Sequence, residues 1–408
     1  MGKKKIFNDP VYGFVSVPYG ILFDLVEHPF FQRLRRIKQV SMTHYVYPGA
    51  LHTRFHHALG AMHLMTQAIE ELRSKGTEIT EEEAEAARIA ILLHDIGHGP
   101  FSHTLEHTLI NITHEELSLL FMQQLNEEFG GALNLAISIF TGEYPKKFLH
   151  QLISGQLDMD RMDYLNRDSF FTGVYEGVIG YDRIIKMLAV FEDELVVEEK
   201  GIYSIEKFLM ARRLMYWQVY LHKTVLSAEQ MLIATLKRAK ALSREGVELQ
   251  VPPSMQFFLR NEFSATDFQQ RRPELLKHFA RLDDYDIFSA LKAFIEGPDP
   301  LLAYLSECIV DRRLFKLELQ NQPFSEEYKE QIQSCIRKKF DFAESGLSHL
   351  FLEGEERNNT YSIARDEIKI LFKNRKVLPF SECSDVNIPS GIVTKYYIGY
   401  PKECLVRS

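Results

Sequence analysis

Histidine is concentrated in one stretch of the sequence. Nine of the fifteen histidines fall within residues 52–114, far more than an even spread would place there. They are His52, His56, His57, His63, His94, His98, His103, His107 and His114. Histidine is the commonest metal ligand in proteins, and its charge changes near neutral pH. The stretch therefore predicts a metal site, an acid–base site, or both.

Two of these histidines stand close to charged residues. His94 and Asp95 form a doublet directly after the apolar run 89–93. Arg54 and His57 are three residues apart, a spacing that places them on one face of a helix. A neutral imidazole nitrogen together with a carboxylate oxygen suits Mn, Fe, Ni, Zn or Mg rather than a thiolate site.

A further polar group lies in the segment 158–168. If this segment is a helix, one face collects Asp160, Asp163, Tyr164, Arg167 and Asp168. The apolar residues Met159, Met162 and Leu165 fall elsewhere and are available for the core. If the polar face is buried, its carboxylates need cations. The alternative is a solvated face with local ion pairs.

The elements that position these residues are predicted to be helices. Apolar spacing indicates helices over 29–39 and 53–73. Thr80 and Glu83 form a capping box that opens another helix. Residues 205–241 are helical as well, as one helix or two. Along that segment one stripe contains Arg212, Tyr216, Tyr220 and Lys223.

The pattern changes after about residue 310. Here a period-two segment, a helix and two strands are predicted over 314–319, 326–339, 368–372 and 393–400. We therefore expect a mainly α fold. A helical core should cover residues 1–309, and a small α+β lobe should cover residues 310–408.

Composition narrows the class of protein. Of 408 residues, 45% are hydrophobic and 25% are charged, as in ordinary globular proteins. No apolar run is long enough to span a membrane, and no apolar signal segment follows the basic start, so we expect a cytoplasmic protein. Its four cysteines are then reduced thiols. The net charge of −8 does not favour nucleic-acid binding, although a local basic patch would permit it.

The ordered set of motifs resembles the HD-domain phosphohydrolases. His57, then His94 and Asp95, then Asp160 match the H…HD…D signature of that family. Similarity to its deoxynucleoside-triphosphate triphosphohydrolase (dNTPase and dGTPase) branch extends over 5–10, 31–39, 47–50, 94–103 and 160–168. The resemblance is strong over residues 5–225.

The resemblance implies one divalent metal ion, either Mn, Mg, Fe, Ni or Zn. Its ligands would be His57, His94, Asp95 and Asp160. His56 is the alternative to His57, and the family pattern favours His57. Such a site leaves positions on the ion for water and for a phosphate oxygen, and the ion lowers the pKa of the bound water.

The family's catalytic residues also have counterparts in this sequence. His103 and His114 match the catalytic histidines, and Glu106 matches a carboxylate. Because Glu106 lies three residues after His103, we expect it to orient that imidazole and to raise its pKa. His98 faces the phosphates in relatives. A charged imidazole at His103 could then donate a proton to the leaving oxygen.

Family positions that hold the substrate can be carried over in the same way. Those that contact the triphosphate match Arg54, Arg161 and Arg212. Those that contact the deoxyribose match Gln39, Tyr164, Asp168 and Tyr220. Tyr216 stands where relatives can carry a histidine that reaches the nucleotide, so base preference does not follow from the resemblance.

Relatives also bind a regulatory nucleotide between subunits. The matching positions here are Lys5, Glu27, Gln32 and Arg35, and all four are chemically compatible with that role. The alternative is a basic tail at Lys5 and a solvated helix face at Arg35. The basic segment 311–316 resembles an element near that interface, which favours a homo-oligomer.

These observations predict hydrolysis of a deoxynucleoside triphosphate (dNTP) to a deoxynucleoside and triphosphate. One alternative is an HD phosphohydrolase that acts on another nucleotide or phosphate ester. The other is a sensor of nucleotides or nucleic acid without turnover, which would have no need of the complete set of ligands and catalytic histidines.

Overall fold

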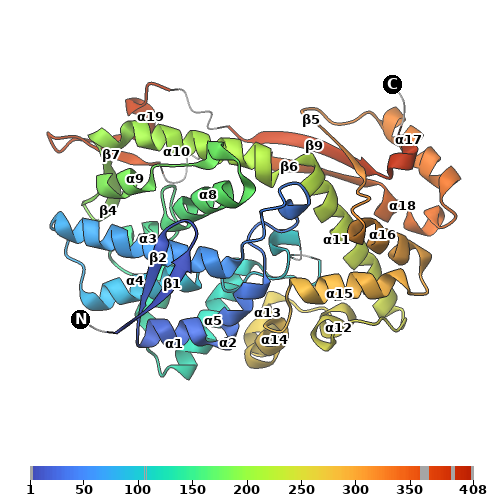
Figure 1. Cartoon of the computed structure of the whole chain (residues 1–408), viewed down its shortest axis with the longest axis horizontal. Helices are drawn as coiled ribbons and strands as arrows, with labels where there is room; N and C mark the ends of the chain where they lie inside the picture. The colour runs from blue at the N-terminus through green and yellow to red at the C-terminus, as the bar shows by residue number, and fades with distance from the viewer. Residues whose placement is uncertain (1–2, 105, 107, 359–366, 387–390, 406–408) are drawn as a thin grey trace.

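Helices make up most of the chain, and small sheets flank them (Figure 1). This computed structural model describes residues 3–104, 106, 108–358, 367–386 and 391–405. The mainly α class predicted from the sequence is confirmed. Within the described part of the chain, no helix combines the length and the apolar character needed to cross a bilayer.

The helices follow one another with short connections. The longer ones in the first 250 residues are α3 (Arg54–Ser74), α4 (Glu81–Leu93), α5 (His114–Glu128), α8 (Met159–Thr172), α10 (Ile202–Met215) and α11 (Lys223–Arg244). Shorter ones before and between them are α1 (Ile21–Glu27), α2 (Pro29–Gln32), α6 (Asn134–Phe140), α7 (Lys147–Gln151) and α9 (Tyr181–Met187). After α11 come α12 (Pro253–Arg260), α13 (Ala265–Gln270), α14 (Arg272–Phe279), α15 (Asp284–Ile295), α16 (Pro300–Val310), α17 (Glu326–Lys339), α18 (Ala343–Leu350) and α19 (Phe380–Cys383).

The helix start predicted at Thr80 is confirmed. Thr80 caps α4, and the side chain of Glu83 accepts a hydrogen bond from its backbone nitrogen at 2.8 Å. Thr113 caps α5 in the same way with Glu116. These caps satisfy backbone N–H groups that the first turn of a helix leaves without partners.

The helix predicted over 29–39 is shorter than expected. α2 ends at Gln32, and a 3-10 helix, Arg33–Arg36, follows it. After the 3-10 helix the backbone is extended at Ile37. The backbone nitrogen of Gln39 then donates to the carbonyl of His52 at 3.0 Å. This pairing places Gln39 beside the start of α3.

Three small sheets are present among the described residues. β1 (Lys4–Asp9) and β2 (Gly13–Pro18) form an antiparallel hairpin, with Lys4 opposite Pro18. The second sheet has the order β3 (Leu188–Phe191), β4 (Glu194–Glu198), β7 (Lys369–Leu371) and β8 (Val377–Pro379). The third has the order β5 (Lys316–Gln320), β9 (Val393–Tyr400) and β6 (Leu352–Asn358), and its pairs are antiparallel.

The residues after 310 contact the helical part through several elements, including β7, β5 and α18. β7 pairs in parallel with β4, with Ile370 opposite Val197. α17 and α18 lie at the other end of the molecule, and β6 and β9 run along one side between the two ends (Figure 1). Apolar side chains from both parts, such as Leu232 and Ile398, belong to one continuous core. The division at residue 310 stays a prediction.

Candidate active site and metal centre

Three helices bring the four predicted metal ligands together. His57 lies in the first turn of α3, and Asp160 lies in the first turn of α8. His94 and Asp95 follow the last residue of α4. His57 is fully buried, whereas the carboxylate of Asp160 is partly open to the surface.

Two glycines allow the close packing that this convergence requires. A Cβ atom on Gly60 of α3 would lie 2.0 Å from Oδ1 of Asp163 on α8. A Cβ atom on Gly97 would lie 2.3 Å from the backbone oxygen of His114 at the start of α5. Because the interior is close-packed, a larger residue at either position would push these elements apart.

The predicted ligand atoms face one another. Nε2 of His57 lies 3.3 Å from Nε2 of His94 and 3.2 Å from Oδ1 of Asp160. Nε2 of His94 lies 3.5 Å from Oδ1 of Asp160 and 3.4 Å from Oδ1 of Asp95. Metal–ligand bonds of about 2.1 Å place neighbouring ligands about 3.0–3.4 Å apart, so the spacing suits a single ion.

The other nitrogen of each histidine ring is already engaged. Nδ1 of His57 donates to Oδ2 of Asp163 at 2.7 Å, and Nδ1 of His94 donates to the backbone oxygen of Ile91 at 2.6 Å. When Nε2 gives up its proton to bind an ion, each ring is a neutral tautomer with the remaining proton on Nδ1 and a lone pair on Nε2. The ligand atoms of His57, His94 and Asp160 all lie within 4.8 Å of one another, and this donor set fits a divalent metal ion. Asp95 lies beside them, and its Oδ2 pairs with Arg54.

The electrostatics of the cluster favour positive charge at the same point. Burial opposes a charge on His57, but Asp160 and Asp163 raise the pKa of its imidazole to about 10. Burial also works against the ionised form of Asp160, but His57 and His94 hold the pKa of that carboxyl below its usual range. The carboxylates thus stay ionised and stabilise a cation.

His56, the alternative to His57, has a different contact. Its Nδ1 accepts a hydrogen bond from the backbone nitrogen of Thr53 at 3.2 Å, at the N-terminus of α3. The imidazole of His57, in contrast, reaches both His94 and Asp160.

A buried chain of ion pairs supports His57 from behind. Asp163 contacts His57 and also accepts two hydrogen bonds from Arg167, both at 2.9 Å. Arg167 donates in addition to Oδ2 of Asp9 at 2.7 Å, at the end of β1. Asp163 and Arg167 are fully buried. At Asp163 and Arg167 the polar face of α8 is therefore buried and ion-paired, and the alternative of a solvated face is wrong there.

Replacing Asp163 with asparagine is expected to weaken metal affinity about 10–100-fold, the usual cost of losing the partner of a metal-binding histidine. The measurement is competition for the metal with a chelator. Asp9→Asn is the matched control, because Asp9 contacts Arg167 but not His57. Equal losses of affinity in the two variants would contradict a specific role for Asp163.

A second cluster lies beside the first. The rings of His98 and His114 stack with their centroids 3.9 Å apart, and Oε1 of Glu106 lies 2.6 Å from Nδ1 of His114. Nε2 of His98 lies 3.4 Å from Oδ1 of Asp95. Burial and the charge of Arg54 hold the pKa of His98 well below its usual value, so its imidazole is neutral near pH 7.

The predicted pairing of Glu106 with His103 is not described, because the side chain of His103 lies outside the described residues. The described partner of Glu106 is His114, whose backbone nitrogen also donates to Glu106 at 3.0 Å. This contact could not be predicted, because His114 lies eight residues after Glu106 and no local pattern links the two. A turn between Glu106 and the N-terminus of α5 brings the two residues together.

The three arginines predicted to hold phosphates differ in their surroundings. Arg54 is buried, forms an ion pair with Asp95 and lines the cavity described below. The charges of Arg161 and Arg212 both lower the pKa of Tyr164, although burial raises it overall to about 12. Arg161 pairs with Asp158, and Nη1 of Arg212 donates to Oε1 of Gln156 at 3.3 Å. Neither arginine is among the described residues that line the cavity.

The stripe predicted from Arg212 to Lys223 on one helix is wrong. α10 gives way to a π-helical turn, Tyr216–Tyr220, and α11 begins only at Lys223 with His222 as its N-cap. The π-turn changes the residues-per-turn spacing on which the stripe was based. Lys223 is exposed, whereas Tyr216 and Tyr220 line the cavity.

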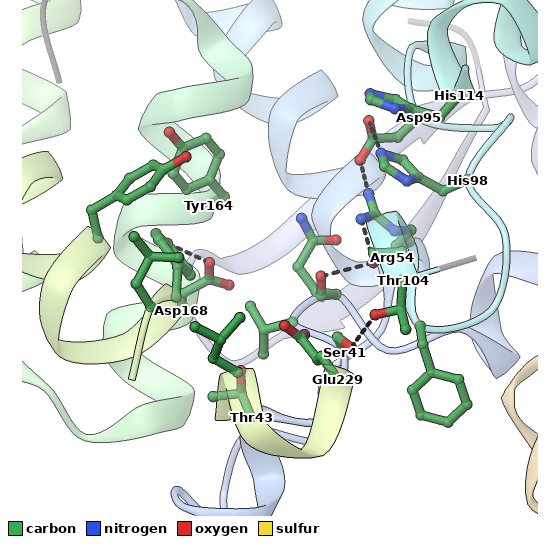
Figure 2. A pocket seen from close by; sticks show the side chains of 18 of the residues that line it. Ser41, Thr43, Arg54, Asp95, His98, Thr104, His114, Tyr164, Asp168 and Glu229 are labelled. Atoms are coloured by element: carbon green, nitrogen blue, oxygen red, sulfur yellow. Dashed lines mark hydrogen bonds and ion pairs between the residues drawn. The ribbon is translucent and has the colours of Figure 1, made fainter. Parts of the chain in front are cut away.

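A cavity of about 580 Å³ opens beside the two clusters. Its lining includes Gln39, Ser41, Thr43, Arg54, Asp95, His98, Thr104, His114, Asp160, Tyr164, Asp168, Tyr216, Tyr220, Glu229 and Glu356. Figure 2 shows Asp95, His98 and His114 on one side, Tyr164 and Asp168 on another, and Ser41, Thr43 and Glu229 on a third. The predicted deoxyribose residues are thus brought to one cavity with part of the metal cluster.

Asp168 is held rigidly in the cavity wall. Its Oδ1 lies 2.7 Å from Nε2 of His52, and its Oδ2 accepts from the hydroxyl of Tyr220 at 2.7 Å. The ring of His52 stacks on Phe171 with a centroid distance of 4.5 Å. Gln39 also faces the cavity, and its buried Oε1 has no hydrogen-bond partner among the described residues. Such an oxygen can accept a hydrogen bond from a ligand hydroxyl.

The positions predicted to bind a regulatory nucleotide lie away from this cavity. Nε of Arg35 donates to Oε1 of Gln32 at 2.8 Å, and its guanidinium lies 3.6 Å from the centre of the Phe55 ring. Burial lowers the pKa of Arg35, and the nearby charge of Glu27 opposes this. Lys5 is exposed on β1. Binding of a nucleotide there stays a prediction.

Comparison with known proteins decides the family. The HD domain model matches residues 54–168, and the HD associated region model matches residues 179–250. The protein YwfO of Bacillus subtilis (strain 168) is 34% identical over 323 residues, which cover 78% of this chain and 72% of YwfO. A crystal structure of a phosphohydrolase from Bacteroides thetaiotaomicron VPI-5482 is 52% identical, with a TM-score of 0.94, and covers 98% of this chain and 100% of that chain. The chain is an HD-domain phosphohydrolase.

A further relative has a named activity. The deoxynucleoside triphosphate triphosphohydrolase SAMHD1 homolog of Dictyostelium discoideum is 31% identical over 268 residues, which cover 61% of this phosphohydrolase and 52% of that relative. The chain thus spans about half the length of that relative.

The sequence did not identify all residues around the site of this HD-domain phosphohydrolase. His52 was noted only as part of the histidine-rich stretch, and its contact with Asp168 was missed. Glu229 and Glu356 line the cavity from α11 and β6 and were also missed. A glutamate within an amphipathic helix carries no signal of such a position, because the opposing strand comes from a distant part of the chain.

Replacing Glu229 with glutamine is expected to stabilise the fold at alkaline pH. Burial raises the pKa of Glu229 from 4.5 to about 7; a hydrogen bond from Ser41 lowers it, and the charge of Glu356 raises it. The folded state then binds this proton more tightly than the unfolded state does. Ionisation of Glu229 therefore destabilises the fold as pH rises through this range, and the full effect is present above about pH 7.

Chemical denaturation of both proteins at about pH 8.5 and pH 4.5 measures this effect. The glutamine variant should be more stable by about 1–3 kcal/mol at the higher pH and should gain little at the lower pH. Glu245→Gln, an exposed position at the end of the same helix, is the control. The same gain at both pH values would show that ionisation of Glu229 is not its cause.

Proposed function

We propose that this HD-domain phosphohydrolase hydrolyses dNTPs at the α-phosphorus and releases a deoxynucleoside and triphosphate. The observation that carries the proposal is the cavity itself. It combines the metal cluster, a buried arginine and a wall built from Gln39, Tyr164, Asp168 and Tyr220. The dNTP triphosphohydrolase named among the relatives supports the same substrate class.

The proposed step is a displacement at phosphorus. The oxygen of a water molecule bonds to the α-phosphorus, the bond from phosphorus to the 5′-oxygen breaks, and the 5′-oxygen takes a proton. A divalent ion held by His57, His94, Asp95 and Asp160 would supply Lewis acidity and lower the pKa of a water. Arg54 would stabilise negative charge on the phosphates.

The proton of the leaving oxygen needs a donor. The sequence assigns this role to His103 with Glu106. The contact of Glu106 with His114 supports His114 as a second candidate, because a carboxylate that accepts from one ring nitrogen orients the imidazole. His98 is held neutral by burial, as its lowered pKa indicates, and suits a hydrogen bond to phosphate.

The fixed carboxylate of Asp168 in the cavity wall would discriminate against ribonucleotides. Because His52 and Tyr220 engage both oxygens of Asp168, its carboxylate cannot easily turn away from a bulky 2′-hydroxyl. Gln39 and Asp168 can bond a 3′-hydroxyl.

The test is a substrate panel with Mn²⁺ or Mg²⁺ that contains dNTPs, ribonucleoside triphosphates, deoxynucleoside monophosphates and cyclic nucleotides. We expect turnover of dNTPs and much slower turnover of the others. Faster hydrolysis of a monophosphate or a cyclic nucleotide would contradict the proposal and favour another phosphate ester as substrate.

A further inference from the structure

The cavity has a side that the proposed mechanism does not use. Figure 2 shows Glu229 on the opposite side of the cavity from Asp95 and His98, next to Ser41. Glu356, on β6, lines the same cavity, and its charge raises the pKa of Glu229. Two acidic side chains from distant segments therefore line one cavity and influence each other.

Burial favours the neutral form of Glu229 and raises its pKa to about 7, so its side chain is a carboxylate above that pH. Ser41 lines the same cavity and lowers this pKa, whereas the charge of Glu356 raises it. Oγ of Ser41 also lies 3.5 Å from Oγ1 of Thr104. Ser41 has a φ of 48°, a left-handed conformation that is uncommon for serine and that requires support from the surrounding structure.

This side of the cavity does not suit phosphate. An anionic group close to Glu229 and Glu356 would be repelled, whereas Arg54 and the metal cluster attract it. A dNTP carries its base at the end opposite the phosphates. With the phosphates beside Arg54, the group that faces Glu229 is therefore the base.

We propose that Glu229 reads the nucleobase and favours bases with an exocyclic amino group over thymine. The inference rests on the proposed dNTP hydrolysis and names the residue that selects among the four substrates. A carboxylate accepts hydrogen bonds and is the usual partner of the cytosine amino group in base recognition. Guanine fits best, because its N1–H and 2-amino groups donate side by side. Thymine presents two carbonyl oxygens around a single N–H, and both oxygens are repelled.

The experiment compares kcat/KM for dGTP, dATP, dCTP and dTTP in the wild type and in Glu229→Gln at about pH 8.5, where Glu229 is ionised. The wild type should disfavour dTTP relative to dGTP by about 10–100-fold, the usual effect of a hydrogen bond to a charged group. Glutamine keeps the size of the side chain and can donate to a thymine carbonyl, so the ratio of dGTP to dTTP should fall toward unity. Deoxyinosine triphosphate, which lacks only the 2-amino group of dGTP, should be a poorer substrate than dGTP for the wild type alone.

Glu245→Gln removes an exposed carboxylate from the end of the same helix and should leave every ratio unchanged. If the wild type hydrolyses all four dNTPs equally, the base-reading role is overturned while dNTP hydrolysis stands. An unchanged dGTP to dTTP ratio in an active Glu229→Gln variant has the same consequence. If the wild type hydrolyses no dNTP, the proposed function and this role fail together.

Discussion

Replacing Asp160 with alanine is expected to remove the metal ion and to reduce hydrolysis by about 10³-fold or more. Oδ1 of Asp160 lies 3.2 Å from Nε2 of His57 and 3.5 Å from Nε2 of His94, so its loss leaves two lone pairs facing each other with less negative charge to hold a cation. Metal assistance contributes several kcal/mol to transition-state stabilisation, and each 1.36 kcal/mol is a factor of ten in rate.

Metal content by elemental analysis and hydrolysis should be measured on the same preparation. The fold should survive, because the carboxylate of Asp160 is partly exposed and Met159 and Met162 keep α8 in the core. Asp182→Ala, at an exposed position on α9, is the control and should retain both metal and activity. Full metal content together with full rate in the Asp160 variant would show that the ligand set is wrong.

The second large effect concerns the proton of the leaving group. His103→Ala should lower kcat by about 10²–10⁴-fold, the usual range for a positioned general acid, and should leave metal content and substrate binding nearly unchanged. His114→Ala is the comparison, because His114 contacts Glu106 at 2.6 Å and stacks on His98.

The two variants separate the two candidates for the acid. If His103 is the donor, its loss removes the acid limb of the pH profile of kcat, and loss of His114 has the smaller effect. The reverse order of effects would transfer the role to His114, with Glu106 as its orienting partner. An unchanged kcat in both variants would rule out either histidine as the acid.

Local patterns predicted the elements well where periodicity and caps are both present. α17 and β9 have the predicted bounds, and α3 begins directly after Thr53. The ligands were found because their types and order form a motif, although the sequence does not show that Nδ1 of His57 is held by Asp163. Spacing within one helix indicated the shared face of Asp163 and Arg167, but not that it is buried.

Features that depend on distant contacts could not be predicted. The β1–β2 hairpin was missed, and Asp9 at its turn is tied to Arg167 by an ion pair across more than 150 residues of sequence. The π-helical turn before Leu221 was missed because its residues favour an ordinary helix as well. Glu229 on α11 and Glu356 on β6 line the same cavity, although they are far apart in the sequence.

The most direct test of the central claim is the identity of the phosphate product. A dNTP should be incubated with the metal-loaded protein in ¹⁸O-labelled water, and the products should be resolved by chromatography and mass spectrometry. The account predicts equal amounts of deoxynucleoside and triphosphate, with the label in the triphosphate, since water attacks the α-phosphorus. Release of pyrophosphate with a deoxynucleoside monophosphate, or of orthophosphate with a diphosphate, would contradict it.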